Sequence, residues 1–319
     1  MKYRHAFHAG NFADAHKHAT LLALLRALAR KDKGFLLLDT HAGRGGYDLS
    51  SSEAHRSHEA DEGLERLLDV TPPAAPSGDA AAGAANAAWP AEIADYLAVV
   101  QSFRRERHHR TAYPGSPLIA LLTLRPQDRA VFIETQPAEH AALREAVSQL
   151  ARYAPSAVAA ARRAVVERTT MECADGYARI PAWLPPIERR ALVLIDPPYE
   201  DAAGDQRALE QASIEVLTRL PSAVVALWYP IKEARDNAVW IERLTSRLPK
   251  PPDAATMPWL ASEICVHPPD SRVGLNGSGM LVVNPPWQLA ERMRAGMPAM
   301  HHAFDPLGRG RWTVRESEA

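Results

Sequence analysis

The second half of the chain alternates short apolar runs with longer helical stretches, and this alternation constrains the fold more than any other feature. After residue 125, runs rich in β-forming residues are separated by segments with helical periodicity. With one earlier run, the predicted strands are 35–39, 130–134, 163–167, 191–195, 223–228, 262–266 and 279–283. The helices between and after them are predicted at 138–151, 205–219, 232–247 and 287–296. Strands that alternate with helices predict an α/β fold with a doubly wound, mostly parallel sheet of seven strands.

A further helix is predicted in front of the first strand. Asn11 can cap it, and Asp14 stands three residues later as a capping-box-like partner. Leucines at 21, 22, 25 and 28 give the helix an apolar stripe. We expect it to end near Gly34.

A long segment separates the first two strands of the predicted sheet. A ribose-binding carboxylate usually follows the first glycine turn by about 20 residues, but Glu134 follows it by about 90 residues. Residues 48–115 are therefore predicted to be a helical insertion, and 1–47 and 116–319 to build one domain around it. Within the insertion, 71–90 is a low-complexity Ala/Pro/Gly tract that predicts a mobile surface loop.

Composition limits the possible classes of protein. The net charge of −1 excludes a wholly basic nucleic-acid binder but permits local basic patches. The two cysteines, Cys173 and Cys265, form neither a metal-binding spacing nor a disulfide framework, as expected in a reducing compartment. No apolar run reaches the roughly 18 residues that span a membrane, and the first residues are too polar for a secretory signal. We expect a cytoplasmic monomer with no membrane partner.

Acidic residues stand at or just beyond the ends of four predicted strands: Asp39, Glu134, Asp175 and Asp196. Open α/β sheets bind ligands at the carboxyl edge of their strands. Each acid alone fits an ordinary surface position, but the repeated register favours a polar, cationic, nucleoside-like ligand. S-adenosylmethionine is such a ligand, since it has ribose hydroxyls, an adenine amino group and a positive sulfonium.

The glycine turn Gly43-Arg44-Gly45-Gly46 follows the first predicted strand. Glycines let a backbone approach a ligand closely, although a tight turn alone also explains them. The dinucleotide fingerprint needs a small residue three positions after the second glycine, where this chain has Asp48. A P-loop needs a lysine after the glycines, and none follows. The turn therefore favours S-adenosylmethionine over NAD or a nucleotide phosphate.

The strand at 191–195 ends in Asp196-Pro197-Pro198-Tyr199. Two prolines end the strand and stiffen the turn that follows. This turn holds a carboxylate beside an aromatic ring, which suits a planar molecule with an amino group. Taken alone, these residues also fit a strand that ends in a Pro-Pro turn and binds no ligand.

Histidines and basic residues near the N-terminus, and a basic run further on, bear on metal and nucleic-acid binding. His16 and His18 lie two residues apart on the first predicted helix and cannot face one metal ion together, so we expect no metal. The segment from Tyr3 and Arg4 to Phe7 mixes aromatic and basic residues, which suits nucleic acid. A denser basic run at 104–110 fits either phosphate contacts or a solvated face.

Seven segments with characteristic residues occur in order from the first residues to about 290. They lie at 1–18, 38–43, 113–120, 194–199, 226–230, 278–280 and 284–287. The most specific stretches within them are His8-Ala9-Gly10-Asn11 and Tyr113-Pro114-Gly115-Ser116-Pro117. On these segments the chain resembles the bacterial 23S ribosomal RNA adenine-N6 methyltransferases of the RlmJ type. The tract at 71–90 is longer than the family leads us to expect.

The resemblance implies a Rossmann-like, seven-stranded class I methyltransferase sheet and an S-adenosylmethionine-dependent activity on 23S rRNA. It implies that Tyr3 touches the RNA and that Asp196 acts on both donor and base. It also implies a set of methyl-donor contacts: His18, His41, Ser116, Glu134, Asp175 and Gly176.

The N6 amine of adenine is a poor nucleophile, because its lone pair is shared with the adenine ring. The Asp196 carboxylate and the Pro197 carbonyl can accept both amine hydrogens, and Tyr199 can stack on the base. A DNA adenine-N6 methyltransferase uses the same motif and remains an alternative. A non-catalytic RNA-binding protein on the same fold is a second alternative.

Overall fold

The computed structural model describes residues 8–52, 59–70, 88–232, 234–251, 256–268, 271 and 273–317. Its centre is an eight-stranded sheet with the order β10-β8-β9-β7-β6-β1-β4-β5. Strands β5, β4, β1, β6 and β7 are parallel neighbours, whereas β9 is antiparallel to both β7 and β8, and β10 is antiparallel to β8. The sheet is thus mixed but mostly parallel, as predicted.

The sheet strands are β1 (Leu36–Asp39), β4 (Arg129–Ile133), β5 (Thr169–Glu172), β6 (Ala191–Ile195), β7 (Val224–Ile231), β8 (Trp259–Cys265), β9 (Gly277–Val283) and β10 (Arg311–Glu316). A separate two-stranded sheet pairs β2 (Gly46–Asp48) with β3 (Ala112–Pro114). The α-helices are α1 (Phe12–Ala29), α3 (Arg66–Asp69), α4 (Ala91–Arg107), α5 (Ser116–Thr123), α6 (Pro137–Arg152), α7 (Ala159–Glu167), α8 (Gly176–Trp183), α9 (Ala202–Arg219), α10 (Ala234–Arg247) and α11 (Leu289–Phe304). A π-helical turn, η2 (Asp61–Glu65), precedes α3.

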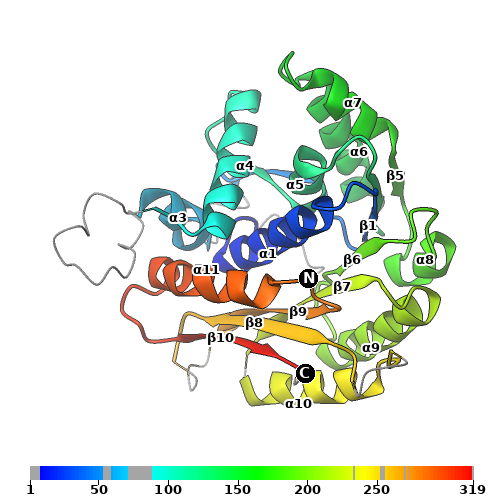
Figure 1. Ribbon diagram of the computed structural model, residues 1–319. Coiled ribbons are helices and arrows are strands. Elements are labelled where there is room, and N and C mark those ends of the chain that lie inside the picture. Colours follow the sequence, from blue (N-terminus) through cyan, green and yellow to red (C-terminus); the bar gives the residue numbers. More distant parts are fainter. Residues whose placement is uncertain are drawn as a thin grey trace.

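Helices cover both faces of the sheet. In β6, Leu192 and Leu194 point into one apolar core, and Val193 and Ile195 point into the other. Figure 1 shows α1 and α11 on one face and α9 and α10 on the other. Because successive side chains of a strand point to opposite faces, a strand buried on both faces must be apolar throughout. This explains the uninterrupted apolar run at 191–195.

The N-terminal helix forms as its sequence predicts. Asn11 caps α1, since its side-chain oxygen accepts a hydrogen bond from the Asp14 amide at 2.8 Å. Asp14 in turn accepts a hydrogen bond from the Gly10 amide at 3.0 Å. The helix ends at Ala29, earlier than expected, and three bend residues lead from it toward β1.

The chain between β1 and β4 contains β2, η2, α3, α4, β3 and α5. Most of the 71–90 tract, residues 71–87, lies outside the described residues. Elsewhere in this stretch, α4 packs against α1 and α11. Among the described residues, none of the helices is long and apolar enough to cross a bilayer.

One predicted strand was wrong, and one strand was not predicted. The stretch 163–167 belongs to helix α7, and the strand begins two residues later at Thr169. The valines at 165 and 166 favour a strand locally, but helical spacing buries Arg162 and Val165 on one side of α7. The eighth sheet strand, β10, was not predicted because its sequence, Arg-Trp-Thr-Val-Arg-Glu, is charged and only partly buried.

Candidate active site

The glycine turn and Glu134 meet at the carboxyl edge of the sheet. Glu134 follows β4, and its Oε2 accepts a hydrogen bond from the Gly43 amide at 2.9 Å. Its Oε1 accepts one from the Gln136 amide at 2.7 Å. Each carboxylate oxygen has two lone-pair directions, so Glu134 can still accept hydrogen bonds from a ligand. Gly43 has a φ of +62°, a backbone conformation that favours glycine.

Ser116 reaches the same edge through the two-stranded sheet. Pairing of Gly46 with Pro114 places the start of α5 against the glycine turn, and the Gly115 amide donates to the Gly45 carbonyl at 2.7 Å. Ser116 then donates to Asp39 Oδ2 at 2.7 Å. Gly115, and not Ser116, occupies the cap position of α5. The hydroxyl contacts Asp39 instead.

Asp39 ends β1 and is almost completely buried. Burial raises the pKa of its carboxyl to about 7, although hydrogen bonds from Ser116 and the His41 amide act in the opposite direction. Burial lowers the pKa of the His41 imidazole to about 4, against the attraction of Asp196 and Asp175. His41 is therefore neutral near pH 7, and its ring meets the ring of Tyr177 edge-on at 4.9 Å.

Asp175 and Gly176 form the start of α8. Asp175 caps the helix by accepting hydrogen bonds from the amides of Tyr177 and Ala178. A Cβ added to Gly176 would lie 2.0 Å from the Thr40 carbonyl oxygen, so only glycine fits there. This close approach brings the loop after β5 against the loop after β1.

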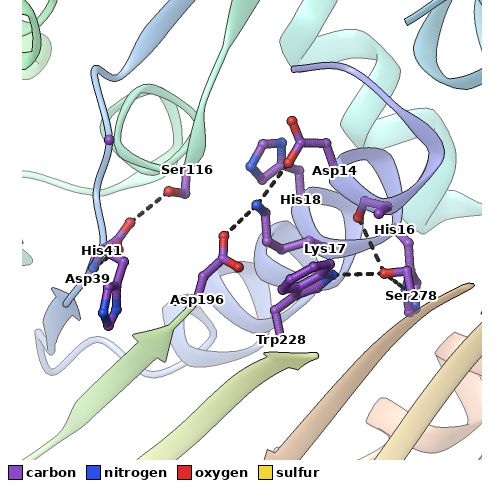
Figure 2. A network of polar contacts seen from close by, with 12 residues as sticks. Asp14, His16, Lys17, His18, Asp39, His41, Ser116, Asp196, Trp228 and Ser278 are labelled. Atoms are coloured by element: carbon purple, nitrogen blue, oxygen red, sulfur yellow. Dashed lines mark hydrogen bonds and ion pairs between the residues drawn. The ribbon is translucent and has the colours of Figure 1, made fainter. Parts of the chain in front are cut away.

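Lys17 links the first helix to the Asp-Pro-Pro-Tyr turn. Figure 2 shows its ammonium between two carboxylates, with Nζ 2.8 Å from Asp14 Oδ1 and 2.5 Å from Asp196 Oδ2. Burial lowers the pKa of Lys17, but the charges and hydrogen bonds of Asp14 and Asp196 outweigh this and hold the pKa well above its usual value. Lys17 is therefore a buried cation that holds one oxygen of Asp196.

Tyr199 and Trp228 form an aromatic corner beside Asp196. The Tyr199 hydroxyl donates to the Trp228 carbonyl at 2.7 Å, and the two rings meet edge-on with centroids 5.6 Å apart. The Trp228 ring lies 5.8 Å from Lys17 Nζ. Tyr199 adopts a left-handed φ of 53°, a backbone conformation that is uncommon for a non-glycine residue.

His16 is linked to this aromatic corner through Ser278. It is completely buried, with Nδ1 2.9 Å from Ser278 Oγ and Nε2 3.0 Å from Ser262 Oγ. Ser278 also accepts a hydrogen bond from Trp228 Nε1 at 3.0 Å (Figure 2). The network ties α1, β7, β8 and β9 together and fixes the Trp228 ring.

We expect His16→Gln to flatten the dependence of stability on pH. Burial lowers the pKa of His16 from 6.5 to about 3. The unfolded chain therefore binds more protons between these values, and stability is lost as pH falls through this window. One such group contributes a slope of about 1.4 kcal/mol per pH unit.

Urea unfolding between pH 4 and 6 tests this expectation. The slope of the unfolding free energy against pH should fall by about 1.4 kcal/mol per pH unit in His16→Gln. The exposed His302, changed to Gln, serves as the matched control. An unchanged slope in His16→Gln would show that the buried imidazole does not stay neutral.

His18 lies one position beyond Lys17 and is also buried. Its Nδ1 lies 2.6 Å from the Tyr113 hydroxyl, which itself lies 3.1 Å from the Tyr96 hydroxyl. His18 thus connects α1 to β3 and α4. The structure places it in a buried polar chain, not on the helix surface.

The structure brings most of the predicted site residues to one edge. Those that end strands or begin the following loops there are His41, Glu134, Asp175, Gly176, Asp196, Pro197 and Tyr199, with Ser116 hydrogen-bonded to Asp39 beside them. Tyr3 and Arg4 lie outside the described residues, so their RNA contacts stay a prediction. Within the described part of the chain, no group of three His, Cys, Asp or Glu side chains is arranged to hold a metal ion.

Sequence reasoning gave no role to Lys17 or Trp228, although both stand in segments that carry the family resemblance. Lys17 is one charged residue in a helix whose partner Asp196 is 179 positions away. The signal available in the sequence was a lysine between two histidines in a helix otherwise rich in alanine and leucine, which indicates a charged residue with a specific partner.

Seven of the sheet strands, in the order β5-β4-β1-β6-β7-β9-β8 with β9 antiparallel, carry the acids and the glycine turn on one edge. This fold and this site define a class I methyltransferase, a Rossmann-like enzyme that uses S-adenosylmethionine as methyl donor. The strand β10 is an addition at the sheet edge.

Comparison with known proteins identifies the family. Residues 32–316 match the family described as "Ribosomal RNA large subunit methyltransferase D, RlmJ", and the chain belongs to this family. It is 37% identical over 314 residues to ribosomal RNA large subunit methyltransferase J of Escherichia coli K12, covering 98% of both chains. It is 35% identical to the Haemophilus influenzae protein of the same name, again covering 98% of both. A crystal structure of a Legionella pneumophila protein matches with a TM-score of 0.77 at 26% identity, over 98% of this chain and 99% of that one.

Proposed function

We propose that the chain, as a monomer, methylates the N6 amino group of an adenine in 23S ribosomal RNA. The observation that carries this proposal is the Asp196 carboxylate. It lies at the carboxyl end of β6, partly exposed and held through Oδ2 by the buried Lys17. Its Oδ1 makes no hydrogen bond to any described residue, so this oxygen can accept one from a substrate.

The residues of the donor half fit S-adenosylmethionine, which supplies an electrophilic methyl group on a positive sulfonium. Glu134 can accept hydrogen bonds from the ribose hydroxyls, and Asp175 can accept one from the adenine amino group. Gly43 and Gly176 leave room where a side chain would obstruct the loops. Ser116, His41 and His18 complete the proposed donor contacts.

The acceptor half can hold the target base. Asp196 Oδ1 and the Pro197 carbonyl can accept both hydrogens of an adenine amine, which directs its lone pair toward the donor methyl. Such positioning can lower a barrier by roughly 7–11 kcal/mol. Tyr199, whose ring is fixed against Trp228, is the proposed stacking surface for the base. Asp196 then takes the proton released by the amine.

The target base must leave its stack to enter this site, at a cost of a few kcal/mol. A loosely structured RNA segment keeps that cost low. Tyr3 and Arg4 are proposed to contact this RNA. The basic run at 104–110 is partly neutralised, since Arg104 pairs with Glu65. Arg107 donates to the uncharged side chain of Gln149 and keeps its charge. Arg105 and Arg110 remain exposed.

We expect Glu134→Gln to raise the KM for S-adenosylmethionine about tenfold with little change in kcat. A hydrogen bond to a carboxylate contributes roughly 1.5–3 kcal/mol, and a ribose contact is similar in the ground and transition states. Steady-state kinetics with saturating RNA measures both constants. Glu172→Gln is the control, because that carboxylate is engaged by Arg179 at 2.6 and 2.9 Å. A kcat loss at unchanged donor KM would remove Glu134 from donor binding.

A competition assay tests the proposed function against its alternatives. Purified protein and labelled S-adenosylmethionine are incubated with unmodified 23S rRNA and duplex DNA together. The proposal predicts label in N6-methyladenosine of the RNA. Label in the DNA would favour the DNA methyltransferase, and absence of donor binding in equilibrium dialysis would favour the non-catalytic RNA-binding protein.

A further inference from the structure

A basic surface lies at the edge of the sheet opposite to the active site. The segment between α1 and β1 exposes Lys31 and Lys33. The turn before β6 adds Arg189, which is exposed, and Arg190. Arg190 joins the two segments, since it donates to the carbonyls of Lys33 and of Leu28, the latter at 2.8 Å. We call Lys31, Lys33, Arg189 and Arg190 the basic edge.

The cations of the basic edge lack carboxylate partners. Within the described part of the chain, none of the four makes an ion pair. The nearby buried acids are already engaged, because Arg125 binds Asp128 through two hydrogen bonds of 2.9 Å, and Arg129 binds Glu188 through two of 3.0 Å. Asp32 is the exposed acid between the two lysines.

The protein holds these like charges together with neutral acceptors. Arg125 donates to the carbonyls of Ala29 and Lys31 at 2.7 and 2.8 Å, which fixes the lysine segment from one side. Partial burial, and then the charge of Arg125, lower the pKa of Arg190. Arg189 adopts a left-handed φ of 54°, a backbone conformation that is uncommon for a non-glycine residue. A fixed, unneutralised group of cations in a chain of net charge −1 suits a polyanion.

Helix α1 connects the basic edge to the active site. Lys17 contacts Asp196 near its N-terminal end, and Ala29 ends it next to the basic edge. Twelve residues of helix span about 18 Å. This is the length of about five stacked nucleotides at roughly 3.4 Å each. This length is the minimum that an RNA strand must span, because α1 is largely buried and the strand has to pass over the surface.

We propose that the basic edge binds phosphates of the RNA that flanks the target adenine. The inference rests on the proposed function, because the substrate proposed there is itself a polyanion longer than the site. It also divides recognition in two, with the base read at the carboxyl edge of the sheet and the flanking backbone held at the opposite edge.

The test compares Lys31→Gln/Lys33→Gln with the unaltered protein on two unmodified fragments of 23S rRNA that carry the target adenine. The long fragment extends at least 15 nucleotides on each side of the adenine, and the short fragment extends three nucleotides on each side. For the long fragment we expect the KM to rise about tenfold and the slope of log Kd against log salt to fall by about 1.5. For the short fragment we expect less than a twofold change, with kcat unchanged on both.

Arg144→Gln/Lys250→Gln is the matched control, because it removes two exposed cations from other surfaces. If the long-fragment KM and salt slope of Lys31→Gln/Lys33→Gln equal those of the unaltered protein, the inference is wrong and the basic edge is a solvated surface. An equal loss on both fragments, or in the control variant, also contradicts it. If the unaltered protein methylates neither fragment, the result contradicts the proposed function itself, and with it the inference.

Discussion

Asp196→Asn is expected to reduce methyl transfer at least a hundredfold while donor binding stays within a few-fold of the unaltered protein. The asparagine keeps the size of the side chain and can still accept one hydrogen bond. It loses the negative charge that pairs with Lys17 and the capacity to take the amine proton. General base catalysis and positioning together account for losses of this size.

Single-turnover methylation of rRNA at saturating donor measures the effect of Asp196→Asn on the rate of methyl transfer. Equilibrium dialysis with labelled S-adenosylmethionine measures donor binding. Asp201→Asn is the control, because Asp201 is an exposed acid on the loop that follows. If Asp196→Asn retains activity within tenfold of the unaltered protein, the Asp196 carboxylate has no part in the transfer.

Lys17→Met should both destabilise the protein and stop methyl transfer. The substitution leaves the buried Asp14 and the partly exposed Asp196 without their shared cation. Removing one member of a buried ion pair costs roughly 3–5 kcal/mol. We therefore expect the melting temperature to fall by about 4–8 °C, and activity to fall at least tenfold because Asp196 Oδ2 is no longer held.

The double variant Asp14→Asn/Lys17→Met separates stability from activity. It removes one of the two carboxylates that lose Lys17, so it should recover part of the lost melting temperature. It should not recover methyl transfer, because Asp196 still lacks Lys17. Lys250→Met, an exposed lysine, should change neither quantity. Recovery of activity in the double variant would show that Lys17 acts only on stability.

The fold was predictable wherever the pattern is dictated by burial. The strand at 191–195 was predicted at its observed bounds because both of its faces are buried, which requires five apolar residues in succession. Two valines at 165 and 166 misled the assignment of α7, because tertiary packing decides between a short helix and a short strand. The strand β10 gives no apolar signal, since it lies at the sheet edge with partly exposed side chains.

The candidate site was predictable to the extent that residues adjoin strand ends. Glu134 and Asp196 follow their strands directly and Asp175 stands three residues beyond β5, so the parallel sheet alone brings them to one edge. Contacts between distant segments were not predictable. The hydrogen bond from Ser116 to Asp39 depends on the pairing of β2 with β3, and the Lys17–Asp196 pair depends on how α1 packs on the sheet.

Mass spectrometry of 23S rRNA nucleosides from cells that lack the gene shows whether this chain uses Asp196 to methylate an adenine of 23S rRNA at N6. The cells are complemented with the unaltered gene or with Asp196→Asn. We expect one N6-methyladenosine per 23S rRNA to disappear, to return with the unaltered gene and not to return with Asp196→Asn. An unchanged N6-methyladenosine content in cells without the gene, or full restoration by Asp196→Asn, would contradict this expectation.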